Sequence, residues 1–447
     1  MTKAKKQIQL NDHFTYRKLI RFTLPSIAMM IFTSIYGVVD GLFVSNFVGK
    51  TSFAAINLVW PFIMMISTIG FMFGTGGSAL VAKTMGEGDN EQANRQFSLL
   101  VYVSFILSVV ISVISFIFMP PIASLLGAHC ELLSDSVLYG RVLIATVPFY
   151  VMQFEFQSFF VTAEKPKLGL YMTIISGVTN IVLDALLVVV FPFGLFGAAI
   201  ATSASQLFGG LFPLIYFARK NSSKLRFTKT KFNLWVLSRT CTNGISELLS
   251  NLSMSFVGML YNAQLMKFAG ENGVAAYGVM MYVNLIFLSV FIGYSLGTAP
   301  VVSYNYGAEN HDELKSLFKK SIVVLSISSI AMFALALFLA KPLSLIFVGY
   351  DEDLLNLTIR GFFFYSFSFL FASAGIFASS FFTALNNGIV SAIISVLRTV
   401  VFQVAFVLLL PIVLKIDGIW CSVAFAELCS LVVAIIMLYN NKDKYHY

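Results

Sequence analysis

The amino-acid sequence predicts an all-α polytopic membrane protein with twelve transmembrane helices, arranged as two six-helix bundles. Three observations predict this fold: an apolar composition, a regular series of apolar runs, and an internal repeat at an offset of 221 residues. Of the 447 residues, 58% are apolar and 11% are charged, about half the charged share of a soluble protein. The mean hydropathy is +0.85. This composition excludes soluble globular, disordered and fibrous chains.

Twelve apolar runs, separated by short polar breaks, give the expected spans. A helix needs about 20 residues to cross the hydrocarbon core of a bilayer. In chain order the runs cover 17–42, 53–82, 97–119, 137–161, 168–191, 195–217, 239–263, 274–302, 318–340, 357–384, 389–413 and 418–439. Because twelve is an even number, both ends of the chain are expected on one side of the membrane.

The distribution of Lys and Arg predicts which side this is. The side with both termini carries 22 of them, including Lys3, Lys5 and Lys6, whereas the other side carries six and Arg398 lies inside a span. Since cytoplasmic loops hold the excess of basic residues, we expect both termini in the cytoplasm and a multi-pass protein of the plasma (inner) membrane. The net charge of +8 is then a topology signal, and we expect no nucleic-acid partner.

The repeat divides the chain into an N-terminal bundle (1–218), a basic cytoplasmic linker (219–238) and a C-terminal bundle (239–447). Residues that match at the offset of 221 include Gly49 with Gly270, Gly76 with Gly297, Gly86 with Gly307, Pro121 with Pro342, and Gly197 with Gly418. Six spans per half predict a parallel repeat about an axis along the membrane normal, with a cleft between the bundles. We expect the GxxxG spacings Gly70–Gly74 and Gly293–Gly297 to allow close packing within the bundles.

Ionisable residues inside spans are the functional candidates, because intramembrane charge is costly. Asp40 closes the first span, while Asn180 and Asp184 lie one turn apart on the fifth. Two carboxyl groups at matching depth could share a proton or hold a sodium ion, with Asn180 as an oxygen ligand. The alternative for Asp40 is an interfacial residue without function.

Two further sets lie elsewhere in the spans. Glu155 and Glu247 are expected in the inner half of the membrane, one from each bundle, where they could meet a cationic substrate in the cleft. The alternative, a structural carboxyl group bonded to a neighbouring helix, stays open for both. Arg398 and Glu427 lie at similar depth in the last two spans and predict a structural ion pair.

The sequence argues against an enzyme and against a resident cofactor. The four cysteines form no CxxC pair, and no HExxH string is present. The string Gly77–Thr84 has Ala82 where a phosphate loop needs glycine, and it continues an apolar helix.

Several motifs resemble those of the multidrug and toxic compound extrusion (MATE) transporters, over essentially the whole chain. They are the string from Tyr36 to Val44 (YGVVDGLFV), Gly49, Ala54-Ala55, Pro61 and the repeated segments Gly76…Gly86 and Gly297…Gly307. The chain looks most like the prokaryotic branch that has an acidic ion site in its N-terminal bundle.

The resemblance implies an ion-coupling site formed by residues of this chain that match the family pattern. They are Asp40, Asn180, Asp184, Thr202 and the backbone carbonyl of Ala198, with Tyr36 and Tyr139 nearby; Pro25 matches a bend in the first helix. If the ion is Na⁺, its ligands would be Asp40, Asn180, Asp184 and Thr202. Glu155 resembles a drug-recognition position, and Glu247 matches an acidic residue of a C-terminal ion site whose usual partner is missing from 362–382.

The resemblance therefore implies a secondary active antiporter that exports organic cations or drugs in exchange for H⁺ or Na⁺ by alternating access. We expect it to act as a monomer, with small organic cations and the lipid bilayer as partners. The alternative is a lipid-linked oligosaccharide flippase of the same superfamily. That function needs a basic cleft to hold a pyrophosphate, whereas Arg398 is the one clearly intramembrane base.

Overall fold

The computed structural model describes residues 8–349 and 351–447, and every regular element in them is a helix. The first half contains α1 (Tyr16–Phe47), α2 (Lys50–Gly86), α3 (Asn90–Ile117), α4 (Met119–Leu125), α5 (Cys130–Ile144), α6 (Val147–Thr162), α7 (Pro166–Asp184), the π-helical segment η1 (Ala185–Val190) and α8 (Gly194–Ala218). The second half contains α9 (Leu234–Gly307), α10 (His311–Val348), α11 (Glu352–Ser366), α12 (Ser368–Ala384), α13 (Gly388–Val396), the π-helical segment η2 (Leu397–Phe402) and α14 (Gln403–Tyr445). The predicted basic residues Lys3, Lys5 and Lys6 lie outside the described residues.

The helices of the described residues resolve into twelve spans. Eight helical stretches are long and apolar enough to cross a membrane, and two bent pairs, α5 with α6 (53°) and α11 with α12 (46°), add two more. Backbone angles at Gly270 and Lys415 are not helical, so they divide α9 and α14 into two spans each. The twelve-helix fold class predicted from the sequence is confirmed.

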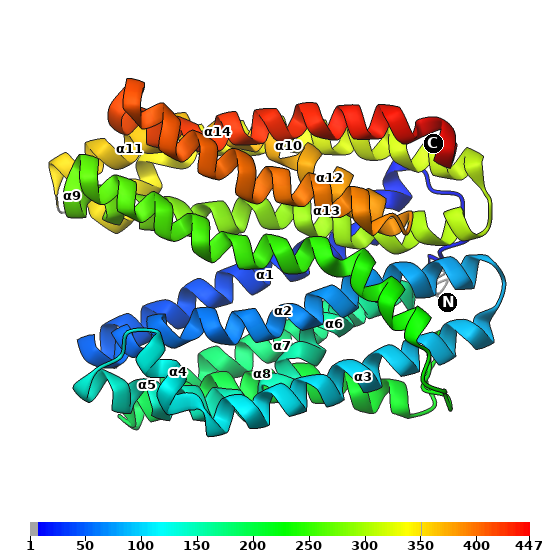
Figure 1. Cartoon of the computed structure of the whole chain (residues 1–447), viewed down its shortest axis with the longest axis horizontal. Helices are drawn as coiled ribbons and strands as arrows, with labels where there is room; N and C mark the ends of the chain where they lie inside the picture. Colours follow the sequence, from blue (N-terminus) through cyan, green and yellow to red (C-terminus); the bar gives the residue numbers. More distant parts are fainter. Residues whose placement is uncertain (1–7, 350) are drawn as a thin grey trace, which may run out of the picture.

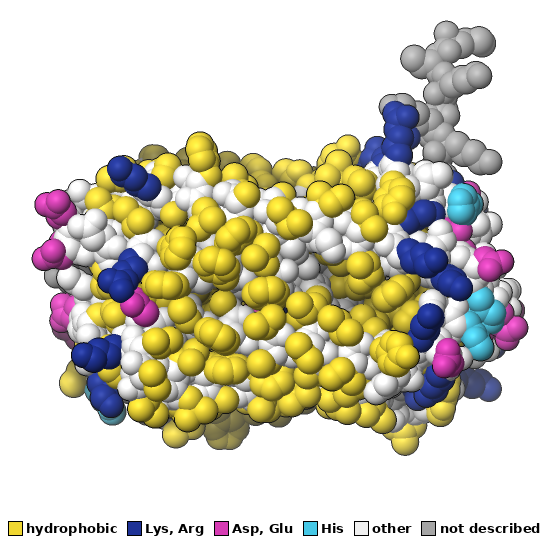
Figure 2. Space-filling view, turned by 90° about the horizontal axis from the view of Figure 1, so that it is seen from above, with side chains coloured by type: hydrophobic (Ala, Val, Ile, Leu, Met, Phe, Trp, Pro, Cys, Tyr) yellow, Lys and Arg dark blue, Asp and Glu magenta, His cyan; other side chains and the backbone are white. Residues whose placement is uncertain are grey.

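The surface of the molecule suits a lipid environment. Apolar side chains cover the middle of the face seen in Figure 2, whereas Lys, Arg, Asp and Glu gather at its two ends. Large apolar side chains are exposed on the helices, such as Phe338 (77% exposed) and Ile412 (75%). Such exposure would be unfavourable in water and is expected where lipid tails surround a helix bundle.

The backbone repeats at the offset that the sequence shows. Three pairs of residues with positive φ are separated by 221 positions, namely Gly49 with Gly270, Gly88 with Glu309, and Gly194 with Lys415. Each pair lies where one span ends and the next begins. Since positive φ is uncommon outside glycine, its recurrence at one offset shows that the two halves share their backbone path.

The two bundles lie side by side along the long axis, and α1 begins at the same end of the molecule at which α14 ends (Figure 1). A Cβ atom added to Gly86 of α2 would collide with the carbonyl of Tyr304, and one added to Gly307 would collide with the carbonyl of Lys83. These two contacts are related by the 221-residue offset. The bundles are therefore sealed against each other at the end that carries both termini.

The two GxxxG strings differ in what they pack against. Gly70 and Gly74 lie against α6 of the same bundle, as the sequence predicts. Gly293 and Gly297 instead meet α1 of the other bundle, at Ile27 and Thr23. The expectation of packing within a bundle is wrong for this second string, because spacing along a helix does not specify which neighbour approaches it.

The linker between the bundles is extended and lies against α3. The ring of Phe227 stacks on that of Phe97, with centroids 5.2 Å apart, and the Asn94 side chain accepts a hydrogen bond from the backbone N–H of Arg226 (2.7 Å). The helix after the linker begins at Leu234, inside the segment 219–238 that was expected to be linker. Asn233 causes this earlier start, since its side chain accepts hydrogen bonds from the first-turn N–H groups of Trp235 and Val236.

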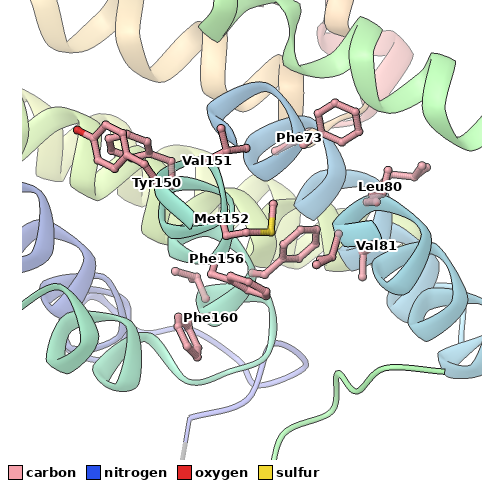
Figure 3. Packing of buried hydrophobic residues seen from close by; sticks show 14 of the residues in the cluster. Phe73, Leu80, Val81, Tyr150, Val151, Met152, Phe156 and Phe160 are labelled. Atoms are coloured by element: carbon pink, nitrogen blue, oxygen red, sulfur yellow. The ribbon is translucent and has the colours of Figure 1, made fainter. Parts of the chain in front are cut away.

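A buried apolar core fixes α6 against α2 in the N-terminal bundle. Figure 3 shows Val151, Met152 and Phe156 of α6 packed near Phe73 and Leu80 of α2, all of them buried. Close packing of this kind fixes the rotation of a helix about its axis. It therefore decides which polar side chains of α6 face the bundle interior.

Candidate functional site

The N-terminal bundle brings the two intramembrane aspartates together. Asp40 comes from α1, and Asp184 is the last residue of α7. Asn180, one turn before Asp184, donates a hydrogen bond from Nδ2 to Oδ1 of Asp40 (3.4 Å), and the two carboxyl groups are close enough to interact. Asp184 is followed directly by η1, and π-helical segments are frequent at functional sites.

Asp184 is an uncompensated acid. Its side chain is 0% exposed, and neither carboxyl oxygen has a hydrogen-bond partner of ordinary geometry among the described residues. A buried carboxylate without a partner is strongly destabilising, so the group needs a proton or a cation. The neighbouring Asp40 adds a second negative charge and strengthens this requirement.

Two hydroxyl groups complete this site from α5 and α8. Tyr139 of α5 is buried, interacts with both carboxyl groups and is hydrogen-bonded to Thr202 of α8. Tyr36, one turn before Asp40, interacts with that carboxyl group. Ala198 is buried one turn before Thr202, and the role of its carbonyl as a ligand stays a prediction.

The oxygen atoms of this site suit a small hard cation or a proton. No three His, Cys, Asp or Glu side chains gather in a way that could hold a metal ion anywhere in the described part of the chain. A sodium ion would therefore depend on the amide of Asn180 and the hydroxyl of Thr202 in addition to the two carboxylates, as hard cations accept neutral oxygen ligands.

Sequence reasoning missed two neutral residues beside this site. Tyr150 of α6 is buried and interacts with Tyr36, Asp40 and Tyr139. Gln153, one turn further along α6, interacts with Tyr36, and neither polar atom of its amide has a hydrogen-bond partner of ordinary geometry among the described residues. The sequence feature that could have pointed to them is their spacing of three residues, which puts both side chains on one face of a helix.

A separate cavity of about 560 Å³ lies between the bundles, within the size range of small-molecule sites. Its lining from the N-terminal half is Met30, Phe71, Thr75, Phe154, Gln157 and Ser158, and the second half provides the rest. The charged residues in its wall are Glu247, Arg398 and Glu427. Asp40 and Asp184 are not among its lining residues, so the acidic pair and the cavity are distinct.

The predicted pairing of Arg398 with Glu427 is present in the structure. Nε of Arg398 donates to Oε1 (3.0 Å) and Oε2 (2.8 Å) of Glu427. The side chain of Arg398 passes Gly375 of α12, where an added Cβ would meet its Cδ at 2.8 Å. Glu247 of α9 also interacts with Arg398. The pair thus joins α14 to the π-helical segment η2 at the cavity wall.

Glu155 does not line the cavity in this conformation. Its side chain is 0% exposed, and it accepts a hydrogen bond from Oγ of Ser104 on α3 (2.5 Å). The cavity-lining residues of α6 are Phe154, Gln157 and Ser158, which share one face of the helix. Glu155 is rotated by about 100° from Phe154, so it points into the bundle, a direction that depth along the span does not reveal.

Comparisons with known proteins agree with this architecture. A protein-family model described as MatE matches residues 25–186 and 248–409, one segment in each half. The chain is 25% identical over 439 residues to the multidrug export protein MepA of Staphylococcus haemolyticus (strain JCSC1435), covering 96% of this chain and 94% of that protein.

Solved structures show the same fold. One described as "Crystal structure of MATE in complex with MaL6" has a TM-score of 0.93 at 23% identity and covers 99% of each chain. Another, described as "Outward-facing conformation of a multidrug resistance MATE family transporter of the MOP superfamily", has a TM-score of 0.92 at 23% identity, again over 99% of each chain.

Proposed function

Because the chain belongs to the MatE family, we propose that it is a secondary active antiporter that exports organic cations in exchange for H⁺ or Na⁺. The family consists of multi-pass membrane transport proteins, and the relatives are named as multidrug exporters. The observation that carries the proposal is Asp184, a fully buried acid beside a second acid, whose carboxyl oxygens have no hydrogen-bond partner of ordinary geometry among the described residues. Such a pair is a binding site for one positive charge.

The separation of the two sites implies that ion and drug are coupled through a moving element. We infer that α1 is this element, since it carries Tyr36 and Asp40 in the ion site and Met30 in the cavity wall. Its Ser34 hydroxyl is also 2.6 Å from the Ser289 hydroxyl of the other bundle. Pro25 breaks a backbone hydrogen bond near the start of α1 and gives the helix a place to bend.

Coupling of this kind has a thermodynamic consequence. If the ion and the drug favour different arrangements of α1, each must weaken the binding of the other by the same factor. With both termini in the cytoplasm, as we propose for a protein of the plasma membrane, the sealed end is the cytoplasmic one and the described state faces outward. Binding of the ion from outside then favours release of the drug.

The test is efflux of a cationic dye from proteoliposomes, with the pH gradient and the Na⁺ gradient imposed separately. We expect one gradient to drive efflux, and Asp40→Asn and Asp184→Asn each to abolish the gradient-driven part. Asp443→Asn is the matched control, because Asp443 is an exposed residue near the end of α14. Efflux that depends on neither gradient would contradict the antiporter proposal. Gradient-driven efflux that persists in Asp184→Asn would also contradict it.

The same preparation tests the alternative function. If no dye moves under either gradient, translocation of a fluorescent lipid-linked oligosaccharide is measured in the same vesicles. Translocation there would support the flippase and overturn the proposal.

A further inference from the structure

A second cavity, of about 300 Å³, lies in the N-terminal bundle between α3 and the bend that joins α5 to α6. α5 and α6 meet at an angle of 53°, and Pro148 at the start of α6 has no N–H group with which to continue the helix. The bend leaves a groove beside α3 that ends at Phe105 and Phe149, whose ring centroids are 5.9 Å apart. The groove is lined by Phe105, Val109, Ser112, Val113, Phe116, Ile117, Ile144, Ala145, Pro148 and Phe149.

The groove opens on the lipid-facing surface, within one leaflet of the membrane. Val113 and Ile117 are exposed at its edge. Because α3 ends at the end of the molecule opposite the termini (Figure 1), this is the outer leaflet when both termini are cytoplasmic, as proposed above. Phe105 and Phe116 lie about 16 Å apart along the helix, close to the ~15 Å that one leaflet contributes to the hydrocarbon core.

A basic side chain is held at the mouth of the groove. Nε of Arg141 donates a hydrogen bond to the backbone carbonyl of Phe116 (3.3 Å), and the guanidinium group lies over the Phe116 ring, 5.4 Å from its centroid. Among residues 8–349 and 351–447, no acidic side chain pairs with Arg141. The contact with Phe116 uses one of the five N–H donors of an arginine, so the other donors are free to bind an anion such as a phosphate.

A hydroxyl group without a partner lies one turn deeper in the same groove. Ser108 of α3 satisfies its hydroxyl within the helix, by donating to the carbonyl of Phe105 (2.8 Å). Ser112 lines the groove and is buried, yet its Oγ atom has no hydrogen-bond partner of ordinary geometry in the described part of the chain. A buried polar group without a partner is unfavourable, and a polar atom of a bound molecule would relieve this cost.

We propose that the groove binds a phospholipid with an anionic headgroup. Arg141 binds the phosphate, the Ser112 hydroxyl donates to an ester carbonyl, and an acyl chain lies along Val109 and Phe105. This order matches the lipid, in which the ester carbonyls lie between the phosphate and the chains, and one helical turn separates Ser112 from Phe116 by about 6 Å. The site shares no lining residue with the central cavity, so it is independent of the substrate that the chain exports.

The internal repeat shows that these two polar groups are not part of the shared architecture. At the offset of 221, Phe333 stands where the first half has Ser112, and Phe362 stands where it has Arg141. The ring of Phe333 packs against that of Phe367, with centroids 5.0 Å apart. The fold therefore requires neither an arginine nor a serine at these positions, which leaves a ligand as the reason for both.

The test uses two lipid probes that differ only in the headgroup. One is a phosphatidylglycerol with a photoactivatable diazirine in one acyl chain, and the other is the diacylglycerol with the same chains. Each probe is added below saturation to the purified full-length protein in detergent and irradiated, and the crosslinked residues are mapped by tandem mass spectrometry. We expect the phosphatidylglycerol to label residues 105–117 and 144–149 about tenfold or more strongly than the diacylglycerol, the range of a hydrogen bond to a charged group.

The variant Arg141→Gln removes the charge at the mouth of the groove. We expect it to reduce labelling of these two segments by the phosphatidylglycerol to the level of the diacylglycerol. Lys341→Gln is the matched control, because Lys341 is an exposed basic residue predicted on the same side of the membrane, and it should label as the parent does. Equal labelling by the two probes in the parent would show that lipid merely fills a crevice, and this result would overturn the inference. Labelling that does not change in Arg141→Gln would overturn it as well.

Ser112→Ala provides a second test, because it leaves the contact between Arg141 and Phe116 in place. We expect it to reduce labelling by the phosphatidylglycerol about threefold, since a neutral hydrogen bond contributes less than one to a charged group. Unchanged labelling in Ser112→Ala would contradict the placement of the ester group, and with it the inference.

Discussion

At the scale of single residues, the hydroxyl group of Tyr139 reports on whether the acidic pair is an ion site. It is bonded to Thr202 and lies beside both carboxyl groups. We expect the Tyr139 hydroxyl to donate a hydrogen bond to the ionised pair, and Tyr139→Phe removes this bond while it keeps the ring. Hydrogen bonds to charged groups contribute about 1.5–3 kcal/mol. We expect the concentration of the coupling ion at half-maximal dye efflux to rise about tenfold or more. Tyr171→Phe, on an exposed face of α7, is the control and should match the parent.

The sequence predicted some of these residues and could not predict others. Asp40, Asn180 and Asp184 were found because a charge in an apolar run is conspicuous and a spacing of four residues places two side chains on one helix face. Tyr150 was missed because a neutral aromatic residue in a span is ordinary. The depth of Glu155 followed from counting along the helix, but its direction depends on how α6 packs against α2 and α3.

At the scale of helices, the glycine contact between α2 and α9 determines how closely the bundles approach at the sealed end. Gly86→Ala adds a methyl group that would collide with the Tyr304 carbonyl, and overpacking costs about 1–3 kcal/mol. We expect a smaller fraction of the molecules to adopt the sealed arrangement. Spin labels are attached at the exposed positions Lys167 and Lys319, one on each bundle. The distance between the two labels, measured by pulsed electron paramagnetic resonance, should be longer in Gly86→Ala than in the parent.

The control for this change is Gly37→Ala, where an added Cβ meets no atom within 4 Å. An unchanged distance distribution in Gly86→Ala would show that the contact does not govern opening.

The helix ends also explain a limit of sequence reading. The run 318–340 predicted the apolar part of α10, yet the helix extends over His311–Val348, because backbone hydrogen bonds continue beyond the hydrocarbon core.

At the scale of the whole molecule, the orientation in the membrane decides which compartment the cavity faces. Both the linker and the end of α14 lie at the sealed end, whereas α5 begins at the opposite end (Figure 1). Cys130 is exposed at the start of α5, and Ser222 is exposed in the linker. A membrane-impermeant maleimide can therefore label the two ends separately.

We expect Cys130 to react in intact cells when Cys241, Cys421 and Cys429 are changed to serine. A Cys130→Ser/Ser222→Cys variant in the same background should react only after the membrane is permeabilised. This pattern follows from the 22 basic residues on the side of the termini, since such an excess stays in the cytoplasm. The reverse pattern would place the sealed end outside, so the described conformation would open toward the cytoplasm and would be the state that loads a drug for export.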